Sequence, residues 1–217
     1  MTRLPRSASV AHAAEGAKLH APAAERNAAA IVALMGEIAP ERGRALEIAS
    51  GTGQHIVALA AAIPQIDWYP SDIAPERIAS IDAYRREAAL TNLHPARLLD
   101  ATVSGWGAAT GGFDMAHVTN LLHLIPTQAA LTLVQEAARA LRPGGRMMIY
   151  GPFLRDGVLT SPGDARFDAD LRAADPAIGY QDDSWLTSVL QDAGLRLILT
   201  RDMPANNLAF VAAKEPR

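Results

Sequence analysis

Glu47 and the two glycines that follow it, Gly51 and Gly53, form the pattern with the clearest chemical meaning in this chain. An apolar run ends at the glutamate, and helix-forming sequence begins directly after the second glycine. This order is typical of a strand that enters a glycine turn and then a helix, whose first N–H groups and dipole face a bound ligand. The pattern therefore predicts a site for a nucleotide-like ligand.

The residues around the turn distinguish between two such ligands. The dinucleotide fingerprint G-x-G-x-x-G needs a third glycine, and this chain has Ile56 at that position. A carboxylate before the turn does not suit a pyrophosphate, but Glu47 suits a ligand with an ammonium group. S-adenosylmethionine has an α-amino group and a sulfonium and no phosphate, and a glycine turn lets the backbone approach it closely. Alternatively, Glu47 caps backbone amides of its own loop.

Two further acids follow predicted strands. Asp72 comes 19 residues after Gly53, where it can accept hydrogen bonds from two ribose hydroxyls of either NAD or S-adenosylmethionine. Asp100 can accept from the exocyclic amine of adenine, while the backbone of Ala101 bonds a ring nitrogen. Either acid alone could be a helix cap or a solvated loop residue, but acids at successive strand ends favour a cofactor site. The predicted cofactor contacts are Glu47, Ser50, Gly51, Thr52, Gly53, Gln54, Asp72, Ile73, Asp100, Ala101, Asn120, Arg26 and Asn27.

The segment after the strand predicted over 113–119 holds candidate catalytic residues. Asn120 is expected to orient the acceptor or to bond the methionine end of the cofactor, unless its amide only satisfies loop backbone groups. His123 is the candidate base, since an ordinary histidine pKa of about 6.5 permits proton uptake at neutral pH; alternatively, it is a packed, hydrogen-bonded histidine. Tyr150, at a later strand end, is a third candidate. His117 is expected inside a central strand, as a core residue.

Helical and strand patterns alternate along the chain. We predict helices over 22–39, 53–63, 76–90, 128–141, 167–173 and 184–193. We predict strands over 45–49, 66–69, 96–99, 113–119, 146–150, 195–200 and 208–213. Such alternation predicts an α/β fold with a parallel, doubly wound sheet, in which ligands bind outside the carboxyl ends of the strands.

The connection before the last strand is a candidate substrate-binding segment. If the last strand is reversed, the loop over 202–207 emerges at the carboxyl edge of the sheet, beside Pro152. Met203, Asn206 and Asn207 would then face the substrate. The alternative is turn chemistry, because asparagine tolerates the positive φ of tight turns.

The chain is predicted to contain one main domain. Residues 1–20 form an N-terminal arm, or a flap over the ligand, and residues 21–217 form a single domain. Residues 151–183 are a loop-rich insert on the substrate side of that domain.

Composition excludes several classes of protein. Of 217 residues, 49% are hydrophobic and 20% are charged, which predicts a packed core rather than disorder. The absence of cysteine removes disulfides, Cys-zinc sites and thiol catalysis, and no metal-ligand cluster is visible. With a net charge of −3 and no basic run, no DNA binding is expected, although a small RNA substrate is not excluded. No apolar stretch predicts a membrane span and no signal-peptide pattern is present, so a cytoplasmic location is expected.

Several motifs together resemble a known family. The run from Glu47 to His55, the Pro70-Ser71-Asp72 motif and the Leu141-Arg142-Pro143-Gly144-Gly145 motif resemble those of class I S-adenosylmethionine-dependent methyltransferases. More narrowly, the chain after residue 20 resembles the methyltransferase-like 26 family, long catalogued as a domain of unknown function. That narrower resemblance rests on Ala24-Glu25-Arg26-Asn27, Tyr150-Gly151-Pro152-Phe153, Phe167-Asp168 and the segment 202–207.

The resemblance implies a Rossmann-like, seven-stranded, mostly parallel sheet with a reversed last strand and helices on both faces. It also implies methyl transfer from S-adenosylmethionine, but no known substrate. The chain departs from the family at Gly163-Asp164, where Ser-Asn is usual, and at Ile178-Gly179, where Trp-Gly is usual. Both departures fall in the insert, so they leave cofactor binding intact and put a shared substrate in doubt.

The cofactor determines the expected mechanism. A sulfonium is already a strong electrophile, so the enzyme mainly aligns a nucleophile with the methyl group and excludes water. The chain lacks the Asn-Pro-Pro-Tyr signature of nucleic-acid amino-methyltransferases, which favours a small-molecule acceptor at O, N or S. The alternatives are a non-catalytic S-adenosylmethionine-binding regulatory protein and an NAD-linked oxidoreductase. The sequence does not determine the oligomeric state.

Overall fold

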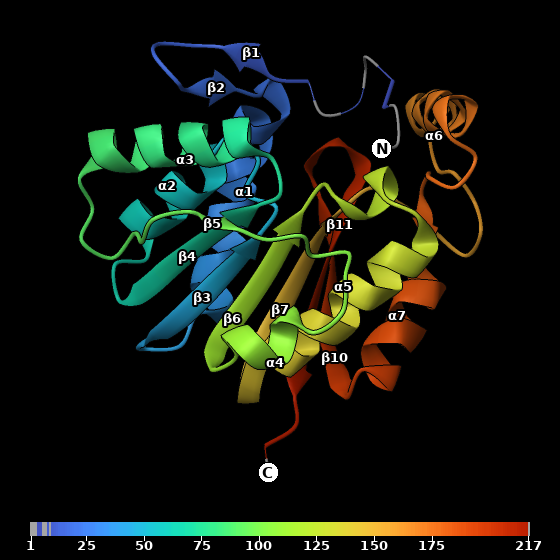
Figure 1. Ribbon diagram of the computed structural model, residues 1–217. Coiled ribbons are helices and arrows are strands. Elements are labelled where there is room, and N and C mark those ends of the chain that lie inside the picture. Colours follow the sequence, from blue (N-terminus) through green and yellow to red (C-terminus); the bar gives the residue numbers. More distant parts are fainter. Residues whose placement is uncertain (1–3, 6–7, 9, 217) are drawn as a thin grey trace.

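A seven-stranded sheet with the strand order β10-β11-β7-β6-β3-β4-β5 forms the centre of the protein (Figure 1). The computed structural model describes residues 4, 5, 8 and 10–216. The strands of this sheet are β3 (Gly43–Ile48), β4 (Ile66–Asp72), β5 (Arg97–Leu98), β6 (Phe113–Thr119), β7 (Leu141–Gly151), β10 (Leu195–Met203) and β11 (Asn207–Lys214). Strand β11 runs antiparallel to both of its neighbours, β7 and β10, whereas the other neighbouring strands of this sheet pair in parallel. The predicted α/β fold with a reversed last strand is therefore confirmed.

The strand order reverses at β3. This strand pairs in parallel with β4 on one side and with β6 on the other, although β6 lies far along the chain. The connections from β3 and from β6 therefore leave in opposite directions at the carboxyl edge. A ligand site is expected at this switch point.

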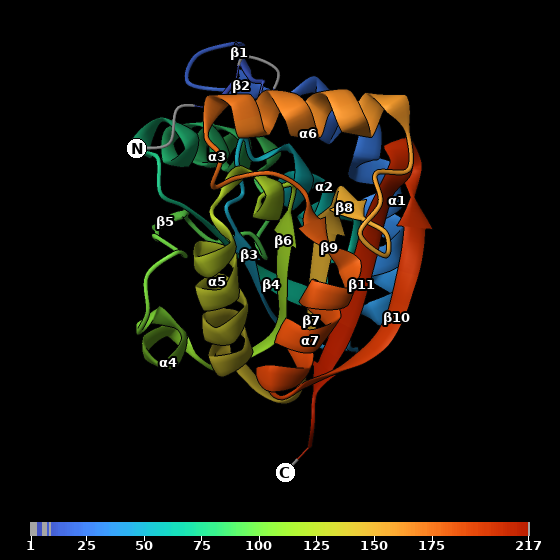
Figure 2. The same ribbon diagram turned by 90° about the vertical axis from the view of Figure 1, so that its right-hand side faces the viewer.

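Helices cover both faces of the sheet, as predicted (Figures 1 and 2). One face carries α1 (Pro22–Ile38), α2 (Gln54–Ala62) and α3 (Pro75–Ala88), and the other carries α4 (Trp106–Thr110), α5 (Thr127–Ala140) and α7 (Asp183–Asp192). Successive strand residues point to opposite faces. Their apolar side chains therefore fill two separate cores.

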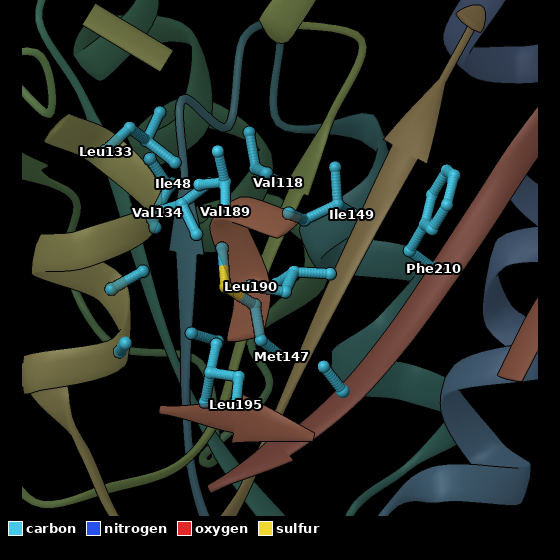
Figure 3. Packing of buried hydrophobic residues seen from close by; sticks show 14 of the residues in the cluster. Ile48, Val118, Leu133, Val134, Met147, Ile149, Val189, Leu190, Leu195 and Phe210 are labelled. Carbon is cyan, nitrogen blue, oxygen red and sulfur yellow. The ribbon is translucent and has the colours of Figure 1, made fainter. Parts of the chain in front are cut away.

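The two cores can be followed along β3. Ala45 packs in the core under α1 and α2, whereas Leu46 and Ile48 pack in the core under α5 and α7. Figure 3 shows this second core, where Ile48 of β3 and Val118 of β6 lie against Leu133 and Val134 of α5. Buried strands that are apolar on both faces are typical of a covered parallel sheet.

The N-terminal segment contains a small hairpin. Its strands β1 (His12–Ala13) and β2 (Leu19–His20) are antiparallel, and Lys18 between them forms an ion pair with Glu87 of α3. Residues 1–3, 6–7 and 9 of the predicted arm lie outside the described residues. The described part is thus docked on the domain rather than free of contacts. Whether it acts as a flap stays a prediction.

The insert has more regular structure than the sequence predicted. The helix expected over 167–173 is α6 (Pro162–Ala174), which begins earlier because the Ser161 side chain accepts from Asp164 N and Pro162 stands at the first helical position. Two short parallel strands, β8 (Phe153–Leu154) and β9 (Gln181–Asp182), hold the ends of the insert together. Figure 2 shows α6 lying across the carboxyl edge of the sheet, with the β1–β2 hairpin drawn above it in that view.

Two further elements differ from the sequence-based prediction. The short helix α4 was not predicted, and β7 begins at Leu141 rather than at 146, because it already pairs with Phe113 of β6 there. Two 3-10 turns, η1 (Leu122–Leu124) and η2 (Pro204–Asn206), lie at the carboxyl edge. Within the described residues, helices are too short or too polar to cross a membrane.

Candidate functional site

The glycine turn between β3 and α2 has the backbone that the sequence predicts. Gly51 has a φ of +60° and Gly53 a φ of +93°, both in the left-handed region that favours glycine. A Cβ on Gly53 would lie 2.9 Å from Ile81 Cα of α3, which is too close for any side chain. Gly53 therefore lets α3 approach the turn, which ends at the first residue of α2.

Glu47 points into the buried region next to this turn. The side chain is 2% exposed, and its Oε1 lies 3.0 Å from His117 Nε2 on the neighbouring strand β6. The other carboxylate oxygen, Oε2, is buried and has no hydrogen-bond partner in the described part of the chain. No described backbone N–H donates to this carboxylate. A buried carboxylate oxygen is costly without a donor, so the geometry fits a cationic group brought by a ligand.

Asp72, at the end of β4, holds the glycine turn in place. Its Oδ2 accepts from Gly51 N at 2.9 Å, and its Oδ1 accepts from Ala74 N at 3.0 Å. Burial raises the pKa of this carboxyl group, while the two backbone donors act in the opposite direction. Each oxygen keeps a second lone pair that can accept a further hydrogen bond. The next residue, Ile73, is 58% exposed, which leaves an apolar surface for a flat ring to cover.

Asp100 makes local contacts of the helix-cap type. Its Oδ1 accepts from Thr102 N at 2.9 Å and from Thr102 Oγ1 at 2.5 Å. Ala101 is buried, and its carbonyl accepts from Trp106 Nε1 at 3.3 Å. These contacts agree with the alternative that Asp100 caps a local turn or helix. The expected adenine contacts of Asp100 and Ala101 stay predictions.

A chain of hydrogen bonds connects the glycine turn to the N-terminal hairpin. Ser80 of α3 donates its hydroxyl to the Thr52 carbonyl at 2.7 Å and accepts from Leu19 N at 2.8 Å. Gln54 Oε1 accepts from Thr52 Oγ1 at 2.9 Å and from Ala21 N at 2.7 Å. The side chain of Gln54 thus supports the turn and the start of α1.

Replacing Ser80 by alanine tests this connection. Ser80 is fully buried, so the change leaves the Thr52 carbonyl and the Leu19 N–H without their partner. We expect the free energy of unfolding to fall by about 1–3 kcal/mol, measured by urea denaturation. Ser188→Ala is the matched control, because that serine is exposed and bonds only its own helix. Equal stability of the two variants would contradict the prediction.

Residues of α1 approach the end of β7. Asn27 is buried, and its Oδ1 lies 2.7 Å from His55 Nε2. Burial raises the pKa of Tyr150, and the side chains of Asn27 and Asn207 act in the opposite direction. Three distant segments therefore meet at Tyr150. Arg26 is exposed and makes no contact of this kind with the described residues.

His55 is a buried residue that was not predicted to belong to the site. Burial lowers the pKa of its ring, although the negative charge of Glu47 opposes this effect. Its position directly after Gln54, in the first turn of the helix that follows the glycine turn, was the available signal.

Asn120 and His123 both lie next to Gly151 at the end of β7. A Cβ on Gly151 would lie 3.9 Å from Asn120 Oδ1 and 3.8 Å from His123 Nδ1. Asn120 has a φ of +54°, and its N–H donates to the Tyr150 carbonyl at 2.8 Å. The two candidate catalytic side chains are therefore brought together.

The His123 ring lies in an aromatic cluster. It is 6% exposed and contacts Phe167 and Tyr180 edge-on, with centroid distances of 5.8 and 6.1 Å. Its ring nitrogens have no hydrogen-bond partner among the described residues. Burial lowers the pKa of His123 to about 3, so the ring is neutral at physiological pH.

The low pKa of His123 predicts an acid-sensitive fold. Below about pH 6.5 the unfolded chain binds a proton at this residue, whereas the folded protein does not until about pH 3. The free energy of unfolding should therefore decrease as the pH is lowered through this window, by up to about 1.4 kcal/mol per pH unit from this residue alone. In His123→Gln that contribution is absent, so urea denaturation from pH 8 to pH 4 should give a shallower dependence. A parallel dependence in the two proteins would contradict this.

The β10–β11 connection lies beside β7, since Leu208 pairs with Gly151. Asn206 has a φ of +60°, and its amide nitrogen donates to Asp164 and to Thr160 Oγ1. The Asn207 amide nitrogen donates to the Pro204 carbonyl at 2.9 Å. Met203 and Pro152 are buried nearby. The chain itself occupies both amide nitrogens, which agrees with the turn alternative, and a substrate role for these four residues stays a prediction.

Charged side chains line a cavity of about 680 Å³ at the opposite, amino edge of the sheet. Its acid Asp114 accepts from Arg44 N at 2.8 Å and forms an ion pair with Arg142. None of the predicted site residues lies there, and no group of three potential metal ligands occurs within the described ranges. The candidate site is therefore at the carboxyl edge.

Comparison with known proteins agrees with this fold. A family model described as "Protein of unknown function (DUF938)" matches residues 18–214. An O-methyltransferase family protein from Burkholderia thailandensis superimposes with a TM-score of 0.76 at 17% identity, over 87% of this chain and 56% of that one. The S-adenosylmethionine-dependent methyltransferase SibL, in its apo form, gives 0.73 at 21% identity, over 89% and 56%.

A third similar structure contains a bound small molecule. An O-methyltransferase family 2 protein from Planctomyces limnophilus DSM 3776, in complex with apigenin, gives a TM-score of 0.72 at 19% identity, over 88% of this chain and 57% of that one. This chain thus spans little more than half the length of these proteins. At such identities the similarity shows a common fold.

Proposed function

The chain belongs to the DUF938 family, and we propose that it is an S-adenosylmethionine-dependent methyltransferase that acts on a small molecule. One observation carries the proposal: the buried, unpaired Oε2 of Glu47 beside the glycine turn. NAD offers no ammonium group for this oxygen, whereas S-adenosylmethionine does. The similar methyltransferase structures support the same choice of cofactor. The narrower resemblance to the methyltransferase-like 26 family stays a prediction.

The residues present suit the parts of this cofactor. Glu47 would accept from the ammonium group, Asp72 from the ribose hydroxyls, and Asp100 from the adenine amine. Ile73 would cover one face of the adenine ring. When bound, S-adenosylmethionine supplies an electrophilic methyl group on its sulfonium.

The chain's own task is then to align the acceptor. Asn120 and His123 both lie next to Gly151 at the end of β7, where they would bond a single polar group of the acceptor. A neutral His123 accepts a hydrogen bond from an acceptor hydroxyl through one ring nitrogen. It is a weak base, but the proton of an attacking hydroxyl becomes strongly acidic as its oxygen bonds to carbon, so a weak base suffices. The apigenin complex of a similar protein supports an oxygen acceptor on a small molecule.

Calorimetric titration tests the proposal. Purified protein is titrated with S-adenosylmethionine and, as a control ligand, with NAD. We expect micromolar binding of S-adenosylmethionine alone. In Asp72→Ala the affinity should fall about tenfold or more, because the variant loses a ribose acceptor and the contact that fixes Gly51.

Asp67→Ala is the matched control variant. That carboxylate lies on the same strand, but it is exposed and lines the opposite edge of the sheet. Its binding should equal that of the wild type. Binding of NAD instead, or of neither compound, would contradict the methyltransferase proposal. The assignment of the fold would still hold.

A further inference from the structure

We propose that His117 is a positioning residue that holds the Glu47 carboxylate ready for the cofactor's ammonium group. This inference rests on the proposed function and deepens it. His117 lies on β6 directly opposite Glu47 on β3, in the two strands that flank the switch point. It is fully buried, and its Nε2 lies 3.0 Å from Glu47 Oε1. The sequence predicted a core histidine there, and packing alone does not require this contact.

The contact determines the direction of the free oxygen. The last torsion of a glutamate side chain is broad and only loosely confined by its own rotamers. A hydrogen bond to Oε1 fixes that torsion, and Oε2 then has one orientation. Because Oε2 has no partner among the described residues, its lone pairs are fixed in place for a donor from outside the chain. Such pre-organisation reduces the entropy lost on binding.

The His117 ring is itself held from the other side. The Trp68 ring of β4 contacts it edge-on, with a centroid distance of 5.9 Å and an interplanar angle of 83°. Trp68 is fully buried, and its Nε1 donates to the Ile63 carbonyl at 3.3 Å. The small Ala45 side chain, on the strand between them, belongs to the same core. Thus β4, β3 and β6 together fix the carboxylate.

The second ring nitrogen indicates which atom carries the proton. His117 Nδ1 is buried and has no partner in the described part of the chain. A ring N–H there would be an unsatisfied buried donor, so we assign the ring proton to Nε2, which donates to Glu47. In this tautomer the carboxylate keeps its negative charge for the ammonium group. The other buried imidazole near it, His55, is engaged with Asn27.

Two ligands separate positioning from packing. S-adenosylhomocysteine carries the amino-acid end that Glu47 would bind, and 5′-methylthioadenosine lacks it. We compare the dissociation constants of both for the wild type, His117→Phe, His117→Asn and His117→Gln. Phenylalanine keeps the ring without a donor, and asparagine is too short for its amide to reach Glu47. The glutamine amide nitrogen can replace Nε2.

We expect His117→Phe and His117→Asn to weaken S-adenosylhomocysteine about tenfold and 5′-methylthioadenosine by less than about twofold. His117→Gln should restore most of the difference. In a Glu47→Gln background, His117→Phe should have no further effect, because it acts through that carboxylate. If the phenylalanine variant does not fold, the asparagine variant gives the same comparison.

The failures are distinguishable. Equal weakening of both ligands, or no rescue by glutamine, would show that His117 only packs the core and would overturn this inference alone. A wild-type protein that binds neither compound would overturn the proposed function and this inference with it.

Discussion

Replacing Glu47 by glutamine should weaken the binding of S-adenosylmethionine about a hundredfold. Glutamine has nearly the same shape, but it has no charge to balance an ammonium group taken out of water. Removing one charge from a buried, hydrogen-bonded charge pair costs roughly 2–5 kcal/mol, which spans this change in affinity. Calorimetry measures it directly.

The same variant should not lose stability. In the ligand-free protein, Glu47 Oε2 is buried without a donor, and a neutral amide costs less to bury than a charge does. We therefore expect a free energy of unfolding equal to or above that of the wild type, which is typical of a side chain kept for function.

Two controls define the result. Glu41→Gln makes the same change at an exposed position just before β3, and it should bind like the wild type. Binding of 5′-methylthioadenosine should survive in Glu47→Gln. Unchanged affinity for S-adenosylmethionine in that variant would contradict the role of Glu47, and equal loss of both ligands would indicate damage to the whole site.

Local patterns were sufficient to predict the architecture. The apolar run before Gly51, the turn and the helix after it are adjacent in the sequence, so their spacing alone indicates a strand–turn–helix unit. The reversed last strand came from the family resemblance, and the pairing of β11 with β7 confirms it. The short elements β8 and α4 were missed because so short a stretch shows no period.

Contacts between distant residues could not be predicted in the same way. Glu47 was singled out from its place before the turn, but its partner His117 lies 70 residues away and is set by the register of β3 on β6. Asn206 could likewise be placed at the carboxyl edge from its position in the sequence. Its hydrogen bond to Asp164 of α6 could not be predicted, because it joins distant parts of the chain. Strand register across a crossover depends on the assembled sheet and not on local propensity.

The pKa of His123 also depends on contacts between distant residues, which local sequence patterns do not predict. As a sequence feature it suggested a base that titrates near neutral pH. Its burial against Phe167 and Tyr180, both from the insert, lowers the pKa to about 3. The ring is then a neutral hydrogen-bond acceptor rather than a base that is protonated near neutral pH. The insert therefore determines the protonation state of a residue more than 40 positions before it.

Gly107→Ala should destabilise the fold by about 3 kcal/mol or more. Gly107 lies in α4 against α5, where a Cβ would be only 2.1 Å from the Glu136 carbonyl oxygen. Backbone cannot move aside by changing a rotamer, so α4 must shift, and overpacking of this kind typically costs 1–3 kcal/mol and sometimes more. The shift also strains the 2.7 Å hydrogen bond from Gly107 N to Glu136 Oε2, a buried contact with a charged group.

Gly111→Ala isolates the steric cause of that loss. Gly111 ends the same helix with a φ of −52°, and the nearest atom to its Cβ would be 3.5 Å away, which is ordinary contact. Both variants remove the same backbone freedom from the unfolded chain, an effect that by itself stabilises by about 0.4–1 kcal/mol. Gly111→Ala should therefore be at least as stable as the wild type in urea denaturation. If Gly107→Ala matched it, the close approach of α4 to α5 would not contribute to stability.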